Sequence, residues 1–155
     1  PVSEKSLRQS LPYCFKEHLY PGVPKISLHT IHPHEELQIN ELKIVPLRIM
    51  HDKLPILGFK IGKLAYITDM KTIPEEELDF LQDIDCLVVN ALRFTNAHHS
   101  HMLIDEALAF ARRTSAKRVF FTHMCHDIGL HEEVNKILPA GTQLAYDGLT
   151  VEVDV

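Results

Sequence analysis

The sequence lacks several features that mark whole classes of protein. No apolar stretch approaches the roughly 20 residues that a membrane-spanning helix needs. No long run of Lys and Arg is present and the net charge is −5, so the chain lacks the basic footprint of proteins that bind nucleic acids or anionic membranes. Cysteine is scarce and shows no metal-type pairing, as in proteins of reducing compartments (Cys14, Cys86 and Cys125). We therefore expect a cytoplasmic protein whose partners include neither a membrane nor a nucleic acid.

Histidine is the one unusual feature of an otherwise ordinary composition. Of the 155 residues, 45% are apolar and 24% are charged, which is typical of a soluble globular protein with a sizeable core. No internal repeat or low-complexity segment is evident, so we expect a single domain over residues 1–155. Most of the eleven histidines fall into three groups: His29, His32 and His34; His98, His99 and His101; and His123, His126 and His131.

The first half of the chain is predicted to be mainly strand. A short amphipathic piece over residues 3–11 precedes a segment whose prolines rule out a long helix. Residues 51–69 predict a β-hairpin, because Gly62-Lys63 is a tight-turn signal between runs of β-branched and aromatic residues. Patterns of apolar residues predict three further strands, over residues 26–31, 37–39 and 42–50.

Helices alternate with strands in the second half. Thr72 is a plausible N-cap, and Pro74 and three glutamates suit the first turn of a helix. Asp147-Gly148 supplies the turn of a final hairpin. We expect helices over residues 72–82, 102–113 and 130–137, buried strands over 86–89 and 119–122, and a C-terminal hairpin of 143–146 with 149–153. The chain is therefore predicted to have a mixed α/β fold.

Side chains suited to metal binding follow three of the predicted strands. His51 follows the strand over 42–50, Asp69 ends the hairpin, and His123 follows the strand over 119–122. In a parallel or mixed sheet such strand ends meet at one edge. Imidazole and carboxylate ligands suit zinc, and also manganese or iron, and two bound cations can share a water and lower its pKa. The alternative is a solvated loop histidine and a turn aspartate.

The remaining histidines differ in what they indicate. His101 lies at a predicted helix start, where it could be an acid, a base or a phosphate contact, whereas His99 reads more simply as a polar helix entry. His126 is either a second layer behind His123 or an exposed side chain. A nucleophilic role for Cys125 has no other feature to support it. The first histidine group surrounds Pro33 and is expected at the surface (His29, His32 and His34).

Four separated motifs occur in an order that resembles a known family. They are H-x-x-x-x-x-L-G-F-x-I-G-x-L-A-Y-I-T-D from His51, H-x-S-H-M before E-A-L, F-F-T-H-M-C-H-D, and A-Y-D-G. Over residues 42–153 the series resembles the metallo-β-lactamase fold, and within it the PhnP-type phosphodiesterases, which are relatives of RNase Z. The resemblance implies the C-terminal part of an αββα sandwich, with mixed sheets flanked by helices.

The resemblance also implies roles for individual residues. His51, Asp69 and His123 would be metal ligands, with Asp69 bridging two divalent cations and acting in catalysis. His101 would lie near the scissile phosphate, and His98 could accompany it. The cofactor would be zinc foremost, with manganese or iron as alternatives. The expected activity is hydrolysis of a small phosphodiester, and thioesters or lactones are alternative substrates with the same ligand chemistry.

The family's H-x-H-x-D-H motif is absent from the sequence. The nearest imitation begins at His29 and lacks the Asp-His ending. The chain begins at Pro1, so we expect a C-terminal portion of a longer metallohydrolase, with residues 1–41 the least family-like. Such a portion could be an incomplete half-domain that needs another chain. An unpaired sheet edge would also favour self-association, so a homo-oligomer is a further possibility.

Overall fold

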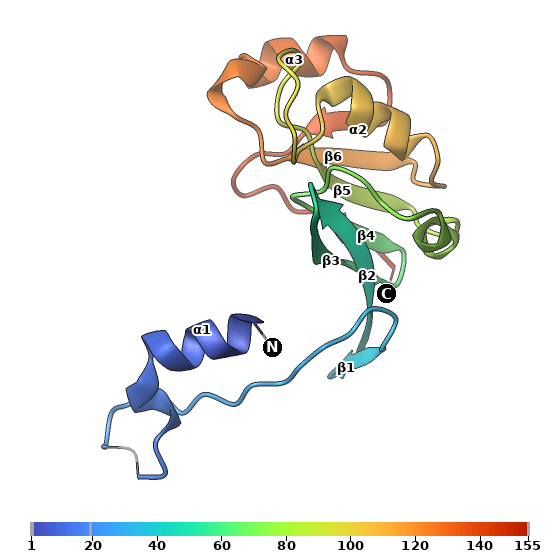
Figure 1. The fold of residues 1–155 in the computed structure, drawn as a ribbon. Coiled ribbons are helices and arrows are strands. Elements are labelled where there is room, and N and C mark those ends of the chain that lie inside the picture. The colour runs from blue at the N-terminus through green and yellow to red at the C-terminus, as the bar shows by residue number, and fades with distance from the viewer. Residues whose placement is uncertain (1, 19, 155) are drawn as a thin grey trace. The chain divides into compact units, whose positions relative to one another are not determined.

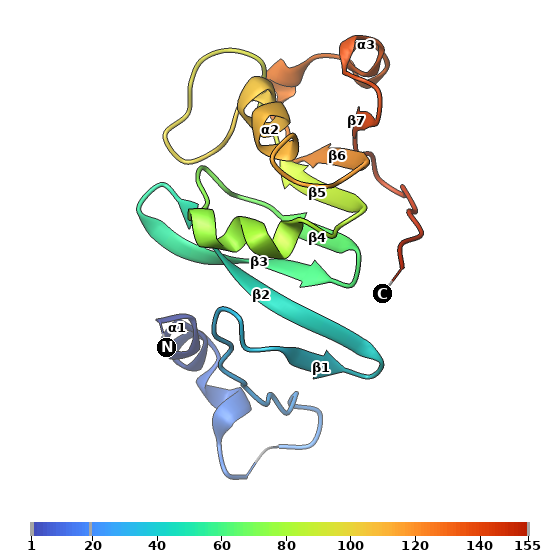
Figure 2. The same cartoon turned by 90° about the vertical axis from the view of Figure 1, so that its right-hand side faces the viewer.

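Strand order follows chain order in the sheet that the described residues form. The computed structural model describes residues 2–18 and 20–154, and the strands of that part form one seven-stranded sheet (Figures 1 and 2). The strands are β1 (Leu37–Ile39), β2 (Leu42–His51), β3 (Leu54–Ile61), β4 (Leu64–Ile67), β5 (Cys86–Asn90), β6 (Arg118–Thr122) and β7 (Thr142–Leu144). Neighbours from β1 to β4 are antiparallel, and neighbours from β4 to β7 are parallel.

This pairing makes several strands end at the same edge of the sheet. Strands β2 and β4 both run antiparallel to β3, and β5, β6 and β7 follow the direction of β4. The β2–β3 turn has Asp52 at φ 54° and the β3–β4 turn has Gly62 at φ 54°, which is the left-handed region that tight hairpin turns use. The prediction of a hairpin around Gly62 is confirmed, and the sequence reading missed the second turn that brings His51 to the same edge.

The helices of the second half pack on one face of the sheet. They are the 3₁₀ helix η2 (Glu75–Leu81), α2 (Ile104–Ala111), η3 (His126–Ile128) and α3 (His131–Ile137). Figure 2 shows α2 and the helix between β4 and β5 in front of the sheet. Alternate strand residues point into this core because side chains alternate across a strand. The fully buried ones include Leu47, Ile49, Ala65, Ile67, Leu87, Val89 and Phe121.

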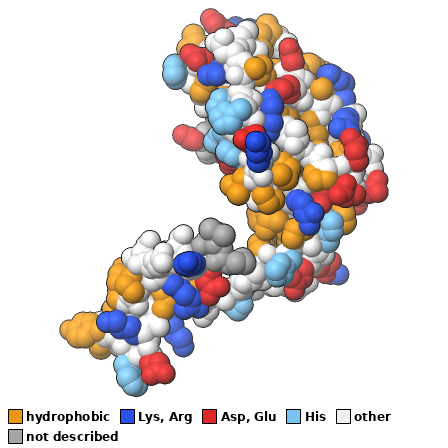
Figure 3. Space-filling model, viewed as in Figure 1, with side chains coloured by type: hydrophobic (Ala, Val, Ile, Leu, Met, Phe, Trp, Pro, Cys, Tyr) orange, Lys and Arg blue, Asp and Glu red, His pale blue; other side chains and the backbone are white. Residues whose placement is uncertain are grey.

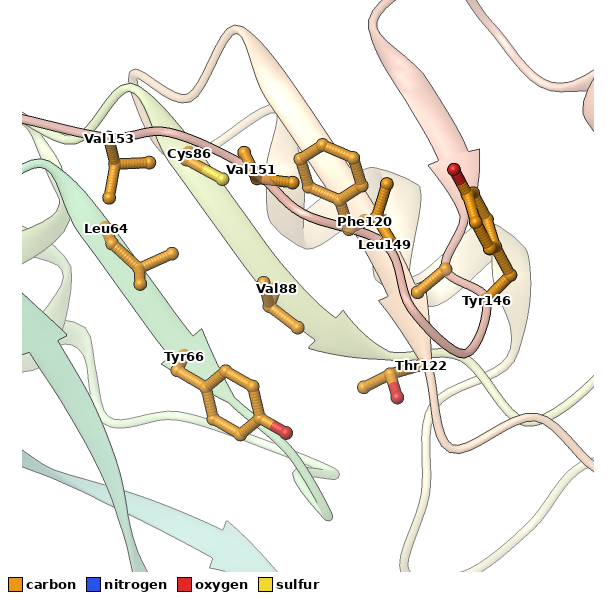
Figure 4. A pocket seen from close by; sticks show the side chains of 11 residues that line it. Leu64, Tyr66, Cys86, Val88, Phe120, Thr122, Tyr146, Leu149, Val151 and Val153 are labelled. Atoms are coloured by element: carbon orange, nitrogen blue, oxygen red, sulfur yellow. The ribbon is translucent and has the colours of Figure 1, made fainter.

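The opposite face of the sheet, which we call the outer face, carries the other alternate residues. It includes Phe59, Leu64, Tyr66, Val88 and Phe120. The segment of residues 149–153 crosses part of this face and encloses a cavity of about 270 Å³ with it (Figure 4). Tyr66 stays 45% exposed, so the outer face is only partly covered.

Residues 1–32 form a separate unit, distinct from the unit of residues 33–155. It contains α1 (Val2–Ser10) and a short 3₁₀ helix η1 (Pro12–Phe15). The guanidinium of Arg8 lies 4.7 Å from the Phe15 ring centroid and pairs with Glu4. Residues 20–32 contain no strand, so the predicted strand over 26–31 is wrong. Its apolar alternation has no neighbouring strand to pair with, and an unpaired strand is not stable in water.

The other strands of the described part confirm the predictions for 37–39, 42–50, 86–89 and 119–122, and α3 confirms the helix over 130–137 to within a residue. Helix α2 is shorter than predicted. No helix among the described residues is long and apolar enough to cross a membrane.

Two predicted elements differ from the structure. Thr72 does not cap a helix, because its backbone bonds to Met50 in an isolated bridge and the following Ile73-Pro74 is extended, so only η2 forms. The C-terminal hairpin is also wrong: β7 pairs in parallel with β6, and residues 149–153 form no strand. The apolar residues of this segment alternate because Leu149, Val151 and Val153 point toward the outer face of the sheet (Figure 4).

Candidate metal centre

Four side chains meet at the edge where the strands end. His51 is the last residue of β2, Asp69 lies just beyond β4, His123 follows β6, and His101 lies in the loop between β5 and α2. The Nε2 atoms of His51 and His101 are 3.2 Å apart. Oδ1 of Asp69 is 3.3 Å from Nε2 of His101 and 3.3 Å from Nε2 of His123. The predicted metal ligands and the predicted phosphate contact therefore form one cluster.

The spacing of these donor atoms fits a divalent cation. Zinc binds imidazole nitrogen and carboxylate oxygen at about 2.0–2.2 Å, so two donors on a tetrahedral ion are about 3.3–3.5 Å apart. The observed separations of 3.2 and 3.3 Å are close to that value. One ligand atom from each of His51, Asp69 and His101 lies within 4.8 Å of the other two. Nitrogen and carboxylate donors also suit manganese and iron, so the donor set does not select one metal.

Two of the four residues hold an unusual backbone conformation. Asp69 has φ 60° and His123 has φ 59°, in the left-handed region that residues other than glycine seldom adopt. Such a conformation costs roughly 1–2 kcal/mol per residue. Both residues follow a strand directly or nearly so, and the positive φ turns the chain sharply at the sheet edge. Four other residues besides glycine have a positive φ in the described part of the chain, so this conformation is not confined to the centre (His34, Asn40, Asp52 and Asn96).

Asn90 fixes the loop that follows Asp69. Its side chain is fully buried at the end of β5, next to β4. The Oδ1 atom of Asn90 accepts a hydrogen bond from the Met70 backbone N–H at 2.8 Å, and its Nδ2 atom donates to the Met70 carbonyl at 3.0 Å. Both backbone groups of the residue next to Asp69 are thus satisfied by one amide, which holds the carboxylate in place.

Lys71 ties this loop to the loop that carries His101. Its ammonium donates to the carbonyl of His101 at 3.3 Å and to both carboxylate oxygens of Glu106 at 2.7 and 2.9 Å. Glu106 also accepts the Leu103 N–H at the start of α2 at 2.8 Å. Burial alone would raise the pKa of Glu106, but the bonds from Lys71 and Leu103 outweigh it and lower that pKa below 4.5. We call this group the Lys71–Glu106 clamp.

The surroundings of His101 favour its neutral form. Its side chain is 13% exposed, and burial lowers the pKa of the imidazole below 6.5. The bond to Asp69 acts in the opposite direction, while the nearby imidazoles of His123, His51 and His98 lower the pKa further. The space-filling view shows histidine side chains grouped at the surface of this unit, with acidic and basic side chains beside them (Figure 3).

Comparison with known proteins identifies the family. Residues 2–124 match the family described as the beta-lactamase superfamily domain. The chain belongs to the metallo-β-lactamase superfamily. This confirms the predicted resemblance and the mixed α/β fold.

Three proteins that resemble this superfamily member are described by different activities or by fold alone. A solved structure titled a new diphosphatase from the PhnP family is 35% identical with a TM-score of 0.83, over 95% of this chain and 53% of that one. A metallo-beta-lactamase fold protein from Bacillus subtilis is 17% identical with a TM-score of 0.67, over 94% of this chain and 61% of that one, and shows the fold alone. A protein of Porphyromonas gingivalis named octanoyltransferase is 39% identical over 96% of this chain and 30% of its own length.

This chain therefore spans about half of the PhnP-family structure and under a third of the Porphyromonas gingivalis protein. The names of those proteins describe chains longer than this one.

The other histidines of this metallo-β-lactamase fold lie as follows. His98 contacts His101, with 3.1 Å between their Nδ1 atoms, whereas His99 is exposed and its ring lies against that of His98. The side chain of His126 is 93% exposed and pairs with Asp127, so it forms no second layer behind His123. The first histidine group is exposed, as predicted (His29, His32 and His34).

Sequence reasoning missed the residues that hold the site together. Ser100 is 2% exposed and lies against two histidines, and Lys71 joins two loops. Neither residue type is a metal ligand at these positions, and neither is part of a recognisable spacing. Of these supporting residues only Asn90 could be suspected from the sequence, because it is a polar residue at the end of a buried apolar run.

Proposed function

We propose that this chain carries metal ligands and a phosphate-directed histidine of a metal-dependent hydrolase that acts on a small phosphodiester. The observation that carries the proposal is that donor atoms of His51, Asp69 and His101 lie within 4.8 Å of one another, with Nε2 of His123 3.3 Å from Oδ1 of Asp69. The similarity to a PhnP-family diphosphatase supports the phosphoester bond as the target.

Each residue has a distinct part in this proposal. His51, Asp69 and His123 would hold the cation, the histidines through imidazole nitrogen and Asp69 through a carboxylate oxygen that would neutralise part of its charge. When bound, a divalent cation supplies Lewis acidity and activates water for attack at phosphorus. His101 lies beside Asp69, in the loop that precedes α2, where it would contact the phosphate or deliver a proton to the leaving oxygen.

A small substrate fits the charge of the chain. The net charge is −5, and a long polyanion would be repelled rather than attracted. The ammonium of Lys71, which donates to the His101 carbonyl, is paired with Glu106 and is not free to bind an anion. We therefore favour a substrate with one phosphodiester group.

A thioester or another acyl ester is the second candidate. The same ligand set serves acyl hydrolysis, and the relative named octanoyltransferase favours an acyl substrate. The match covers 30% of that protein, so we rank this candidate second.

Metal content and hydrolysis measured together test the proposal. The purified chain is loaded with zinc or manganese, dialysed, and analysed for metal by elemental analysis. Hydrolysis of bis(p-nitrophenyl) phosphate is then compared with hydrolysis of an octanoyl thioester. We expect bound metal and preference for the phosphodiester, with both lost in Asp69→Asn and both kept in the exposed control His126→Gln. Preference for the thioester would favour the second candidate.

The variant His101→Gln separates two roles for that histidine. A phosphate contact or proton donor predicts normal metal content with hydrolysis about 10²–10⁴-fold slower. A fourth metal ligand predicts that metal and hydrolysis are lost together. Absence of bound metal in the unmodified chain would contradict the proposal for these 155 residues, and the site would then need ligands from a second chain.

A further inference from the structure

Arg93 lies at the base of the loop between β5 and α2, one of the loops that meet at the metal centre. Leu92, the residue before it, donates its N–H to the carbonyl of Met102 at 2.9 Å, and its own carbonyl accepts the N–H of Cys125 at 2.9 Å. Met102 directly follows His101, and Cys125 belongs to the loop after β6. The backbone next to Arg93 is therefore fixed between two loops that supply donor atoms to the centre.

The guanidinium of Arg93 keeps most of its hydrogen-bond donors for another partner. Its Nε donates to the carbonyl of Asn96 at 3.1 Å. One terminal nitrogen is 3.6 Å from a carboxylate oxygen of Asp127, which is too long for a hydrogen bond. Neither terminal nitrogen has a hydrogen-bond partner among the described residues, and no buried polar side-chain atom of those residues lacks one, so both nitrogens reach water. The whole side chain is only 22% exposed, so its stem is largely covered while its terminal N–H groups are open.

The other two cations in the described loops at this edge suit an anion less well. Lys71 donates to both carboxylate oxygens of Glu106 and is already paired. Lys53, in the turn between β2 and β3, is exposed, and ordering a long exposed side chain costs conformational entropy. A guanidinium also presents parallel N–H groups that match two oxygens of a phosphate, whereas an ammonium is a point charge. Arg93 is therefore the cation of these loops best placed to hold an oxyanion.

We propose that Arg93 binds a phosphate group of the substrate through the terminal N–H groups of its guanidinium. The proposal rests on the function proposed above and narrows it to a substrate that carries phosphate, because the acyl group of a thioester or lactone has no oxyanion for Arg93 to hold. The fixed backbone favours binding, since a preorganised residue loses little freedom when the ligand arrives. Asp127 is the anion next to this guanidinium and competes with the substrate for it.

A purely structural ion pair between Arg93 and Asp127 is the alternative. The pair would then join two loops, as the Lys71–Glu106 clamp does. The separation of 3.6 Å and the 51% exposure of Asp127 disfavour this role, because an exposed pair without a hydrogen bond contributes little to stability. The two roles predict different effects of Asp127→Asn. Removing a competing anion strengthens phosphate binding, whereas removing a structural partner does not.

Binding of inorganic phosphate to the metal-free chain tests the proposal. The full chain is stripped of metal with a chelator, and phosphate is titrated by isothermal titration calorimetry at about pH 8, where an ordinary imidazole is neutral. We expect Arg93→Gln to bind phosphate about tenfold or more weakly, since charge-assisted hydrogen bonds are lost. Arg93→Lys keeps the charge without the paired N–H groups and should be intermediate. Asp127→Asn should bind phosphate more tightly than the unmodified chain.

Arg112→Gln is the matched control, because Arg112 is exposed at the end of α2 opposite to this loop. It should leave phosphate binding unchanged. Equal phosphate affinity in Arg93→Gln and the unmodified chain would overturn the proposal, as would weaker binding in Asp127→Asn or no measurable binding by the unmodified chain. A large loss of unfolding free energy in Arg93→Gln, absent from Arg112→Gln, would favour the structural pair instead. None of these results requires metal or hydrolysis, so this test and the test of the proposed function fail separately.

Discussion

The backbone conformation of two residues at this site lowers the stability of the fold. Asp69 and His123 each adopt a positive φ at the centre, and a side chain at that φ has a repulsive contact between its Cβ atom and the backbone. The clash depends on the Cβ atom and not on the imidazole or carboxylate. The strain can therefore be measured separately from metal binding.

Replacing His123 by glycine should relieve this strain. Both His123→Gly and His123→Ala remove the imidazole, but only glycine adopts φ 59° without a clash. We expect His123→Gly to have the larger free energy of unfolding in urea, by about 1 kcal/mol. The control pair at His126 should show the reverse order, since that residue lies in η3 without a positive φ and glycine is the poorer residue there. Equal stabilities of the two His123 variants would contradict a strained backbone.

At the scale of elements, the Lys71–Glu106 clamp joins the β4 loop to the start of α2. The pKa of Glu106 is below 4.5 in the folded chain, so the folded state favours the charged carboxylate. The stabilisation is therefore complete above 4.5, and it is lost as the pH falls through the folded pKa. Since Glu106 is 45% exposed, solvent screens the pair and we expect an effect of roughly 0.5 kcal/mol.

The variant Glu106→Gln should have a free energy of unfolding that depends less on pH in the acid range. Its free energy of unfolding should fall less than that of the unmodified chain between about pH 6 and about pH 3. Glu132→Gln is the control, an exposed glutamate in the first turn of α3. Parallel stability curves for Glu106→Gln and the unmodified chain would show that the clamp does not couple to pH.

The sequence predicted the elements whose formation depends on local pattern and strand direction. Strand ends at one edge follow from the order of apolar runs, so the meeting of His51, Asp69 and His123 could be anticipated. Residues 26–31 share the strand pattern but have no neighbour, and pairing is not visible in a single sequence. The backbone of Thr72 bonds to Met50 on β2, a contact between distant residues that the local sequence does not reveal. The contact of buried Ser100 with His98 and His101 depends on the path of a loop, which no spacing rule describes.

At the scale of the whole molecule, the two faces of the sheet differ in how much of their surface other elements bury. Helices bury one face, whereas the outer face keeps aromatic and aliphatic side chains partly exposed. Exposed apolar surface of this kind is typical of an interaction site. Thr122 lines the cavity on the outer face, and the next residue is His123, so a partner there would lie beside the metal centre.

The homo-oligomer expected from the sequence can be tested on the outer face, where Tyr66 is 45% exposed. Tyr66→Lys places a charge at a 45% exposed position of that face and should shift sedimentation velocity profiles toward the monomer at every concentration. Ile137→Lys is the control, because Ile137 is 70% exposed on α3 and does not line the cavity on the outer face. If both variants sediment like the unmodified chain, the outer face is not the interface. If Tyr66→Lys alone dissociates, loss of bound metal in the same variant would mean that the second copy helps to complete the centre, whereas unchanged metal content would mean that the donors of one chain suffice.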